Sequence, residues 1–319
     1  MEAAPAVRRL APRFPLAERE LAFLGPLDEG ELLAVLADPA TPHAGRALVG
    51  DRFNLLPGGD PRPGVGLGPD GLPDLAWCEV PGGEVEIALE SAGVWTRLRR
   101  LGRTSAQFRV APFALAKYPV TVAQWRAFLA APDGYDTLFR PRYQVDPDRQ
   151  PGQDNHPAVN LTWIEAIAYC QWLSARLGRE VRLPTEWEWQ QAATSGHPDW
   201  QYPWGRDWAD LRANTSASDL GRLTAVGLYP AGASSQGVMD LAGNAWDWCL
   251  NQYERIANTG PGGNAGRSLR GGSWLGPPAS ARAVNRYWSD PGDRGFSVGF
   301  RLVCACPIPL TTGSLITEH

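Results

Sequence analysis

Lysine, methionine and histidine are scarce in this chain of 319 residues, which has one lysine (Lys117), two methionines and four histidines. Its basic charge therefore comes almost wholly from arginine, and the formal net charge is −4. A nucleic-acid-binding protein needs a concentrated basic surface, which this balance does not supply, so no nucleic-acid partner is expected. Arginine in place of lysine and abundant proline are typical of heat-adapted proteins, and equally of GC-rich coding.

Long apolar runs are also missing. No stretch of 18 apolar residues occurs, so no membrane-spanning helix and no membrane insertion are expected. Residues 1–16 contain three arginines but no apolar core after them, so no secretory signal is expected either. The five cysteines are widely spaced in a chain too large to depend on disulfides. They indicate reduced thiols and a cytoplasmic location.

The N-terminal quarter shows one helical stretch and one loop-rich stretch. Residues 18–50 carry apolar residues at spacings of three and four, which predicts helices. Residues 51–74 are dense in proline and glycine, which is typical of a linker or an extended loop. Short alternating runs at 77–80, 84–89 and 107–110 then predict strands joined by turns.

Three threonines precede helical patterns: Thr121 before 122–130, Thr162 before 163–177, and Thr185 before a third helix. Glu165 and Glu188 stand three residues after the second and third threonine, which is the capping-box pattern. Gly178 is suited to end the second helix. From residue 195 onward the composition is that of loops, and so long a loop region predicts a fold with long, ordered loops pinned by its 14 tryptophans.

Eight motifs occur in the order known from one protein family: PGGE at 81–84, KYPVTVAQW at 117–125, HPAVNLTW at 156–163, RLPTEWEW at 182–189, YPWG at 202–205, GVMDLAGNAWDW at 237–248, RGGSW at 270–274 and GFR at 299–301. Together they resemble the formylglycine-generating-enzyme-like (sulfatase-modifying factor) branch of the C-type lectin fold. The resemblance implies an α+β domain with long ordered loops over residues 75–305. An N-terminal helical segment and Pro/Gly linker (1–74) would precede it, and a tail (306–319) would follow.

The enzymes of this family oxidise a substrate cysteine with two copper-binding cysteines, five residues apart, that follow the Gly-Gly-Ser motif. The resemblance places these positions at Gly276 and Ala281, neither of which can bind copper. A related branch binds iron through histidines, and four histidines make such a site hard to assemble. The resemblance therefore predicts no catalytic residues and no required cofactor. A formylglycine-generating-enzyme-like oxidoreductase without the copper cysteines is the alternative, and a structural interaction module with an unvarying surface is a third.

Residues 269–303 resemble the variable region of proteins diversified by retroelements, in which a reverse transcriptase rewrites the adenines of a template repeat. The frame of such a region is present in 269–274, 281–286 and 299–301. The positions expected to vary lie between these anchors: Leu275, Gly276, Pro277, Ser280, Tyr287, Trp288, Ser289, Asp290, Asp293, Gly295, Phe296 and Ser297. All except Trp288 are reachable from a mutated asparagine codon. The resemblance implies a non-catalytic protein that binds an unknown protein or other macromolecular ligand.

The rings of Tyr287, Trp288 and Phe296 would supply rigid contact area for such a ligand, as aromatic residues do in antibodies. Alternatively, these three rings complete the hydrophobic core. The burial of the three rings distinguishes the two interpretations, because a ligand-binding ring must face solvent.

Two further sets of polar residues call for a role. The segment with Asp240, Gly243, Ala245 and Asp247 resembles a calcium loop of the enzyme family, with Asn214 and Asp219 near a second. Aspartate and asparagine in such loops also make local turn bonds without metal, so Ca²⁺ is an open alternative. Charged residues in aromatic surroundings are expected to be paired inside the protein: Arg182, Glu186, Glu188 and Arg301.

Overall fold

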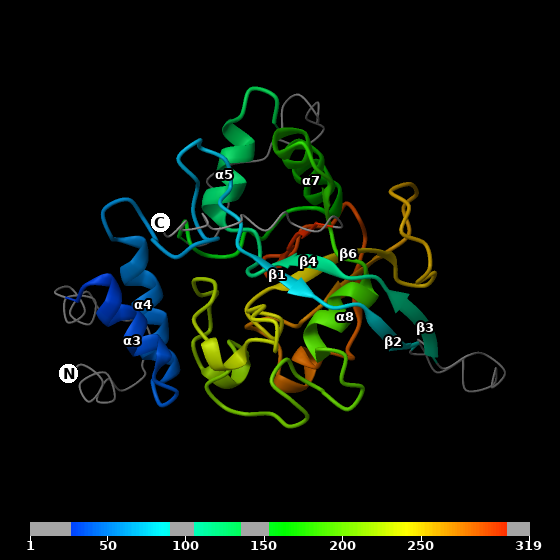
Figure 1. Cartoon of the computed structure of the whole chain (residues 1–319). Helices are drawn as coiled ribbons and strands as arrows, with labels where there is room; N and C mark the ends of the chain where they lie inside the picture. The colour runs from blue at the N-terminus through cyan, green and yellow to red at the C-terminus, as the bar shows by residue number, and fades with distance from the viewer. Residues whose placement is uncertain (1–26, 90–104, 135–152, 305–319) are drawn as a thin grey trace, which may run out of the picture.

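The computed structural model describes residues 27–89, 105–134 and 153–304 (Figure 1). Its helices are α3 (Glu29–Ala37), α4 (His43–Asn54), α5 (Val122–Ala130), α7 (Trp163–Leu177) and α8 (Glu186–Thr194). Three short 3-10 helices interrupt the loops, namely η3 (Ser216–Ser218), η4 (Pro230–Gly232) and η5 (Pro278–Ala281). The described α-helices all lie before residue 195, and the described residues after it form strands, short 3-10 helices and ordered loops.

The strands are β1 (Trp77–Val80), β2 (Gly83–Ala88), β3 (Ser105–Val110), β4 (Phe113–Ala116), β5 (Val181–Arg182), β6 (Trp246–Gln252), β7 (Arg267–Arg270), β8 (Tyr287–Ser289), β9 (Val298–Gly299) and β10 (Val303–Cys304). They form the sheets β1-β4-β10-β5 and β8-β7-β6-β9 and the hairpin β2-β3. All pairs are antiparallel except β6 with β9. The mixed helix and sheet content confirms the predicted α+β fold class.

The three helices predicted after threonines begin where expected, and α5 and α7 also end where expected. Thr121, Thr162 and Thr185 each accept a hydrogen bond from the backbone N–H three residues on. The side chain at that third position accepts the backbone N–H of the cap residue in return, which completes a capping box in all three helices. Gly178 ends α7 in the left-handed conformation, with φ of 63°. Local chemistry therefore accounts for these boundaries.

The N-terminal helices pack against the later loops. Asp28 caps α3 with a full capping box, and α3 and α4 enclose a cluster with Leu228 and Tyr229. Residues 51–54 belong to α4, and the segment that follows is a packed loop instead of a free linker. Gln124 shows this packing, because its side-chain amide donates to the carbonyls of Gly64 and Asp74. The predicted helical residues 18–26 lie outside the described residues.

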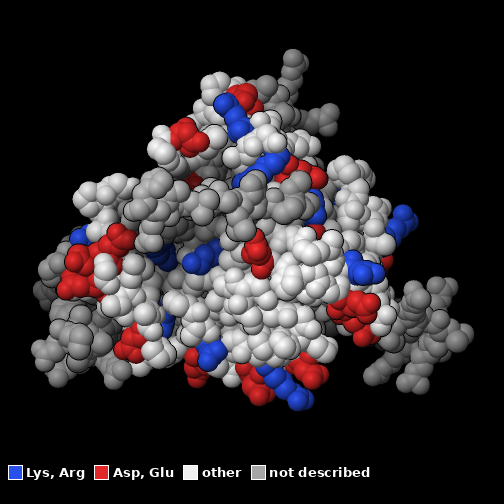
Figure 2. All heavy atoms as spheres, viewed as in Figure 1, with Lys and Arg blue, Asp and Glu red and all other residues white. Residues whose placement is uncertain are grey.

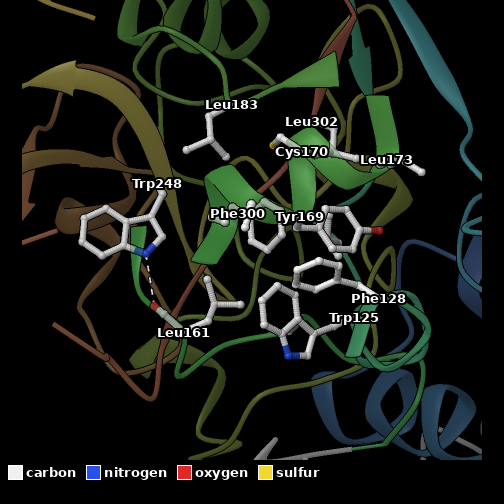
Figure 3. Close-up of a cluster of buried hydrophobic side chains, with 14 of the residues drawn as sticks. Trp125, Phe128, Leu161, Tyr169, Cys170, Leu173, Leu183, Trp248, Phe300 and Leu302 are labelled. Carbon is white, nitrogen blue, oxygen red and sulfur yellow. Dashed lines mark hydrogen bonds between the residues drawn. The ribbon is translucent and has the colours of Figure 1, made fainter. Parts of the chain in front are cut away.

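The main core is a group of aromatic rings that come mainly from α5, from α7 and from Phe300, between β9 and β10 (Figure 3). Trp125 stacks on Tyr169 at 5.8 Å, and the edge of Phe300 meets Tyr169 at 5.3 Å. Trp248 donates its indole N–H to the carbonyl of Leu161 at 3.4 Å. Phe300 therefore fixes the end of the candidate variable segment to the core, because rings at these separations attract and fill the interior without gaps.

Candidate ligand-binding surface

Residues 269–303 run along the sheet β8-β7-β6-β9 and enter it three times. Leu269 lies opposite Trp248 on one side and Tyr287 on the other. Val298 then pairs with Trp246 in parallel, next to β6. Between these strands the segment forms two loops, 271–286 and 290–297, which contain η5 and the turns. The sheet therefore fixes both loops at their ends.

The twelve positions predicted to vary are all at least partly accessible to solvent. The four largest side chains among them are the most informative: Leu275 is 55% exposed, Tyr287 59%, Trp288 47% and Phe296 56%. Single exposed apolar side chains are common on protein surfaces, but four of them within one short segment are typical of a binding surface. The alternative that Tyr287, Trp288 and Phe296 complete the core is therefore not supported.

Most of the frame residues between them are buried, although Arg282 is exposed and Trp274, Val284 and Asn285 are half-buried. Arg270, Ala281 and Arg301 are completely inaccessible, and Ala283 nearly so. Gly272 has φ of 75° and passes so close to Ala281 that an added Cβ would lie 2.9 Å from its Cα. A side chain at position 272 would strain the backbone and would push this position and Ala281 apart.

A buried carboxylate, Glu186 at the start of α8, ties the segment to the helix. It accepts hydrogen bonds from Arg270 at 3.0 Å, from Arg286 at 2.6 and 2.9 Å, and from the Ser268 hydroxyl. Burial raises the pKa of Glu186, but the hydrogen bond from Arg286 and the charges of both arginines outweigh it and lower the pKa overall. The expectation that Glu186 is paired inside is confirmed. Its partners were not predictable, because they lie more than 80 residues away along the chain.

The other three predicted buried charges are also paired. Arg301 donates to Asp247 at 2.7 Å, and both side chains are inaccessible to solvent. Arg182 pairs with Glu188 at 2.6 Å. Arg294, in the second loop, reaches Glu165 at 2.6 Å and the carbonyl of Asn160 at 3.1 Å. Each loop of the segment is thus fixed by an arginine that points inward.

The predicted calcium loop holds a cation of the protein itself. The Arg301 guanidinium donates to the Asp247 carboxylate and to the carbonyls of Met239 and Asp240, at 2.7, 3.1 and 2.9 Å. The Asp240 carboxylate accepts the N–H of Gly227 at 2.6 Å instead of facing these oxygens as a free ligand. Among the side chains and carbonyls of the suggested calcium loop, Arg301 thus binds one oxygen of the Asp247 carboxylate, while the other oxygen is buried without a hydrogen-bond partner in the described structure. Calcium binding at Asp240, Gly243, Ala245 and Asp247 stays an untested prediction.

At the second suggested calcium position, the Asn214 side chain makes hydrogen bonds within the protein. Asn214 accepts from the Ser218 hydroxyl at 2.9 Å and donates to the carbonyl of Arg222 at 2.9 Å. Asp219 lies next to them in the left-handed conformation, with φ of 54°. Within the described ranges, no group of three or more histidine, cysteine or acidic side chains is placed to hold a metal ion.

The positions that the resemblance assigns to copper cysteines have no ligand atoms. Gly276 makes backbone hydrogen bonds with Ser216 and Ser273, and Ala281 is buried. The cysteines that the structure describes, Cys78, Cys170, Cys249 and Cys304, lie at other positions and are all buried. Burial raises the pKa of Cys78, Cys170 and Cys249, so these thiols are protonated and poor nucleophiles.

The exposed rings rest on aromatic residues that sequence reasoning did not assign to the surface. Tyr287 lies 5.7 Å from Trp246, and Trp288 lies 6.5 Å from Tyr253. These contacts join β8 to β6 and to the turn after it. The motif at 237–248 contains two tryptophans, of which Trp248 is buried and Trp246 is only half-buried. This motif was therefore a partial indication that Trp246 supports the surface.

Beside this surface a cavity of about 360 Å³ opens. Its lining comes from three distant parts of the chain: Gln153, His156, Arg222, Leu223, Trp274 and Phe296. Trp274 and Phe296 lie 6.1 Å apart, at an angle of 59°. His156, expected to be a loop residue, is buried beside Asn155 and Gln153.

The charged side chains on the viewed face are mixed in sign, and neither sign forms one continuous patch (Figure 2). None of the helices in the described part of the chain has the length and apolar content that a membrane crossing requires.

The comparisons with known proteins identify the domain. Residues 75–306 match the model of the sulfatase-modifying factor enzyme 1-like domain. The serine/threonine-protein kinase Pkn1 of Chlamydia trachomatis serovar L2 is 33% identical over 210 residues, which are 59% of this chain and 32% of the kinase. The formylglycine-generating enzyme of Streptomyces coelicolor is 30% identical over 185 residues, which are 51% of this chain and 56% of the enzyme. The chain thus spans about a third to about half of these relatives.

Among solved structures, Treponema denticola variable protein 1 has the same fold, with a TM-score of 0.57 and 21% identity. The alignment covers 73% of this chain and 96% of that protein. Proteins named for such different activities share this domain, so the fold alone does not specify an activity. The match over most of the chain, together with the fold, shows that the chain belongs to the family of sulfatase-modifying factor enzyme 1-like domains.

Proposed function

We propose that this chain is a non-catalytic ligand-binding protein. Its ligand-binding surface consists of the twelve positions between Leu275 and Ser297, and a retroelement diversifies them. The ligand is a protein or another macromolecule, and no cofactor is required. The likeness in fold to Treponema denticola variable protein 1 is consistent with this role.

One observation carries the proposal: along residues 269–303 the positions predicted to vary are accessible, while most of the frame residues between them are buried. Every position predicted to vary is accessible, while the anchoring residues Arg270, Ala281, Arg286 and Arg301 are buried. Side chains that face solvent can be exchanged at little cost in stability, whereas buried ones cannot. A protein that must tolerate many sequences at one surface needs this separation.

Recognition would rest on a preformed backbone. The inward arginines and the Gly272–Ala281 contact hold the loops before any ligand arrives. Binding then loses less conformational entropy, whichever side chains are present. The exposed rings would contribute most, because aromatic residues dominate the binding energy of typical interfaces.

The alternative, an oxidoreductase of the same family, finds little support in the site. Its copper chemistry requires two thiolates, and Gly276 and Ala281 stand in their places. We expect no oxidation of a cysteine-containing peptide when the chain is titrated with copper. Turnover in that assay would contradict the non-catalytic proposal and leave the fold assignment intact.

A library of the chain tests the binding proposal directly. Randomising the twelve positions and displaying the variants should leave most of them folded and should yield binders to unrelated protein targets. The control library randomises four buried frame positions, Arg270, Ala281, Ala283 and Arg286, and should be mostly unfolded. Equal survival of both libraries would contradict the proposal.

Genomic sequence tests the diversification. A nearly identical template repeat of the region encoding 269–303, with a reverse transcriptase gene beside it, is the expected finding. If neither is present in the genome that encodes this chain, the surface is an unvarying interaction module instead.

A further inference from the structure

The cavity between Trp274, Phe296 and Leu223 is lined mostly by residues that are not predicted to vary. Among its lining residues only Phe296 belongs to the twelve positions predicted to vary. The others belong to the constant scaffold, so this cavity is a fixed feature next to a variable surface. The inference below rests on the proposed function and names the ligand group that this cavity receives.

The cavity presents no unpaired charge among its described lining residues. Arg222 makes two hydrogen bonds with the Asp51 carboxylate, at 3.1 and 2.6 Å, which neutralise it. Burial, helped by the charge of Arg222, lowers the pKa of His156 to about 3, so this imidazole is neutral. A charged ligand group would lose its hydration in this cavity without gaining a counter-ion, which is unfavourable.

The lining is predominantly apolar but carries two polar atoms that lack a partner in the described structure. These are Oε1 of Gln153, an acceptor, and Nε1 of Trp274, a donor. Both are shielded from water, and buried polar atoms without a hydrogen bond are rare in proteins and costly. Gln153 is only partly buried, so rotation of its side chain can bring the amide to the cavity.

We propose that this cavity binds a tyrosine side chain of the partner protein. The tyrosine ring packs against Trp274, Phe296 and Leu223, at separations typical of aromatic pairs. Its hydroxyl hydrogen-bonds to the Gln153 amide once that side chain has rotated toward the cavity, because a phenol both donates and accepts. A cavity of about 360 Å³ is at the small end of ligand sites, which suits one large side chain.

The test uses p-cresol, which is the tyrosine side chain without its backbone, and toluene, which lacks the hydroxyl. Binding to the full chain is followed through the indole N–H resonance of Trp274 in two-dimensional NMR, assigned with Trp274→Phe. We expect p-cresol to shift this resonance with a Kd about fivefold lower than that of toluene, the effect of one neutral hydrogen bond. Equal affinity for the two probes, or tighter binding of 4-methylbenzoate, would overturn the proposal.

Two variants test whether p-cresol binds in this cavity. Phe296→Ser removes an exposed ring and is expected to fold, and it should weaken p-cresol binding about tenfold, as expected for an aromatic contact. Tyr287→Ser is the matched control, since Tyr287 is an exposed ring outside this cavity, and it should leave p-cresol binding unchanged. Equal effects of the two variants would overturn the proposal.

The outcome is separable from that of the proposed function. Binders selected from a library that keeps Phe296 should lose affinity when Leu223→Ala enlarges the cavity, if the partner inserts a tyrosine there. Selected binders that are insensitive to this change, together with no p-cresol binding, would remove the tyrosine inference and leave the ligand-binding surface in place. Binding of p-cresol without any selectable binders would remove the ligand-binding surface and leave the cavity as a site for a phenol.

Discussion

The inner and outer sides of residues 269–303 are built from different side chains. On the inner side, arginines meet carboxylates at 2.6–3.0 Å, and small residues let the backbone strands approach closely. On the outer side, Leu275, Tyr287, Trp288 and Phe296 reach into solvent. Specific geometry is therefore concentrated inside, while the outside carries contact area. A loop without regular secondary structure becomes rigid in this way, and its surface is free to change.

The largest expected effect comes from breaking the inner side at Glu186. Glu186→Gln removes the charge that faces Arg270 and Arg286, which leaves two buried guanidinium groups without a counter-ion. We expect a loss of about 3–5 kcal/mol in the free energy of unfolding, measured by urea denaturation. Glu254→Gln, at an exposed position nearby, is the control and should change stability little. A loss below about 1 kcal/mol at Glu186 would mean that the ion pairs do not hold the segment.

The second largest effect is expected at Asp240, and it tests how well this buried carboxyl group is shielded from water. Burial raises the pKa of Asp240, next to Arg301, to about 6. The folded state therefore keeps this proton at pH values where the unfolded state has lost it, so Asp240 contributes a loss of stability as pH rises from about 4 to about 6. In Asp240→Asn this loss disappears, and the stability difference between variant and parent should grow by about 3 kcal/mol between pH 4 and pH 8.

Thermal unfolding of both proteins across this pH range measures the difference, and the other titrating groups cancel in the comparison. Asp199→Asn is the surface control for replacing a carboxylate by an amide. A pH-independent difference between Asp240→Asn and its parent would show that the interior at this point is hydrated.

A smaller effect is expected at Arg294, which lies at the boundary between the two sides. Its side chain is 27% exposed and joins the second loop to Glu165 and Asn160. Arg294→Ala should cost about 1 kcal/mol, because partly exposed ion pairs contribute little. Hydrogen exchange should accelerate in 290–297 and not in 271–286. Arg282→Ala, at an exposed arginine of the first loop, is the control, and equal acceleration of both loops would contradict this role.

The smallest effect is expected on the outer side. Tyr287→Ser, Trp288→Ser and Phe296→Ser should each change the free energy of unfolding by no more than about 0.5 kcal/mol, since their rings face solvent. Phe300→Ser is the matched control for Phe296→Ser, because Phe300 is inaccessible, and it should cost about 3–5 kcal/mol. A loss of several kcal/mol at the three outer positions would restore the interpretation that they complete the core.

Much of the fold was predictable because its signals are local. The helices α5, α7 and α8 begin at threonines that cap their own helix, and Gly178 ends α7 by its own backbone conformation. The strands at 77–80 and 107–110 followed from alternation over a few residues. The packing of residues 55–74 was not predictable, because the contacts that hold this loop come from Gln124 and Thr121, about 50 to 60 residues away.

The chain's sequence by itself determined the family, the boundaries of α5 and α7 and the absence of thiols at Gly276 and Ala281, because each depends on residue identity or on neighbours within one turn. Tertiary structure alone decided which side chains of 269–303 face solvent, that Arg301 pairs with Asp247 of the suggested calcium loop, and that Gln153, Leu223 and Trp274 line one cavity. Such contacts join residues far apart in the chain. Their partners are selected by packing and charge in three dimensions, for which a loop without periodicity carries no local signal.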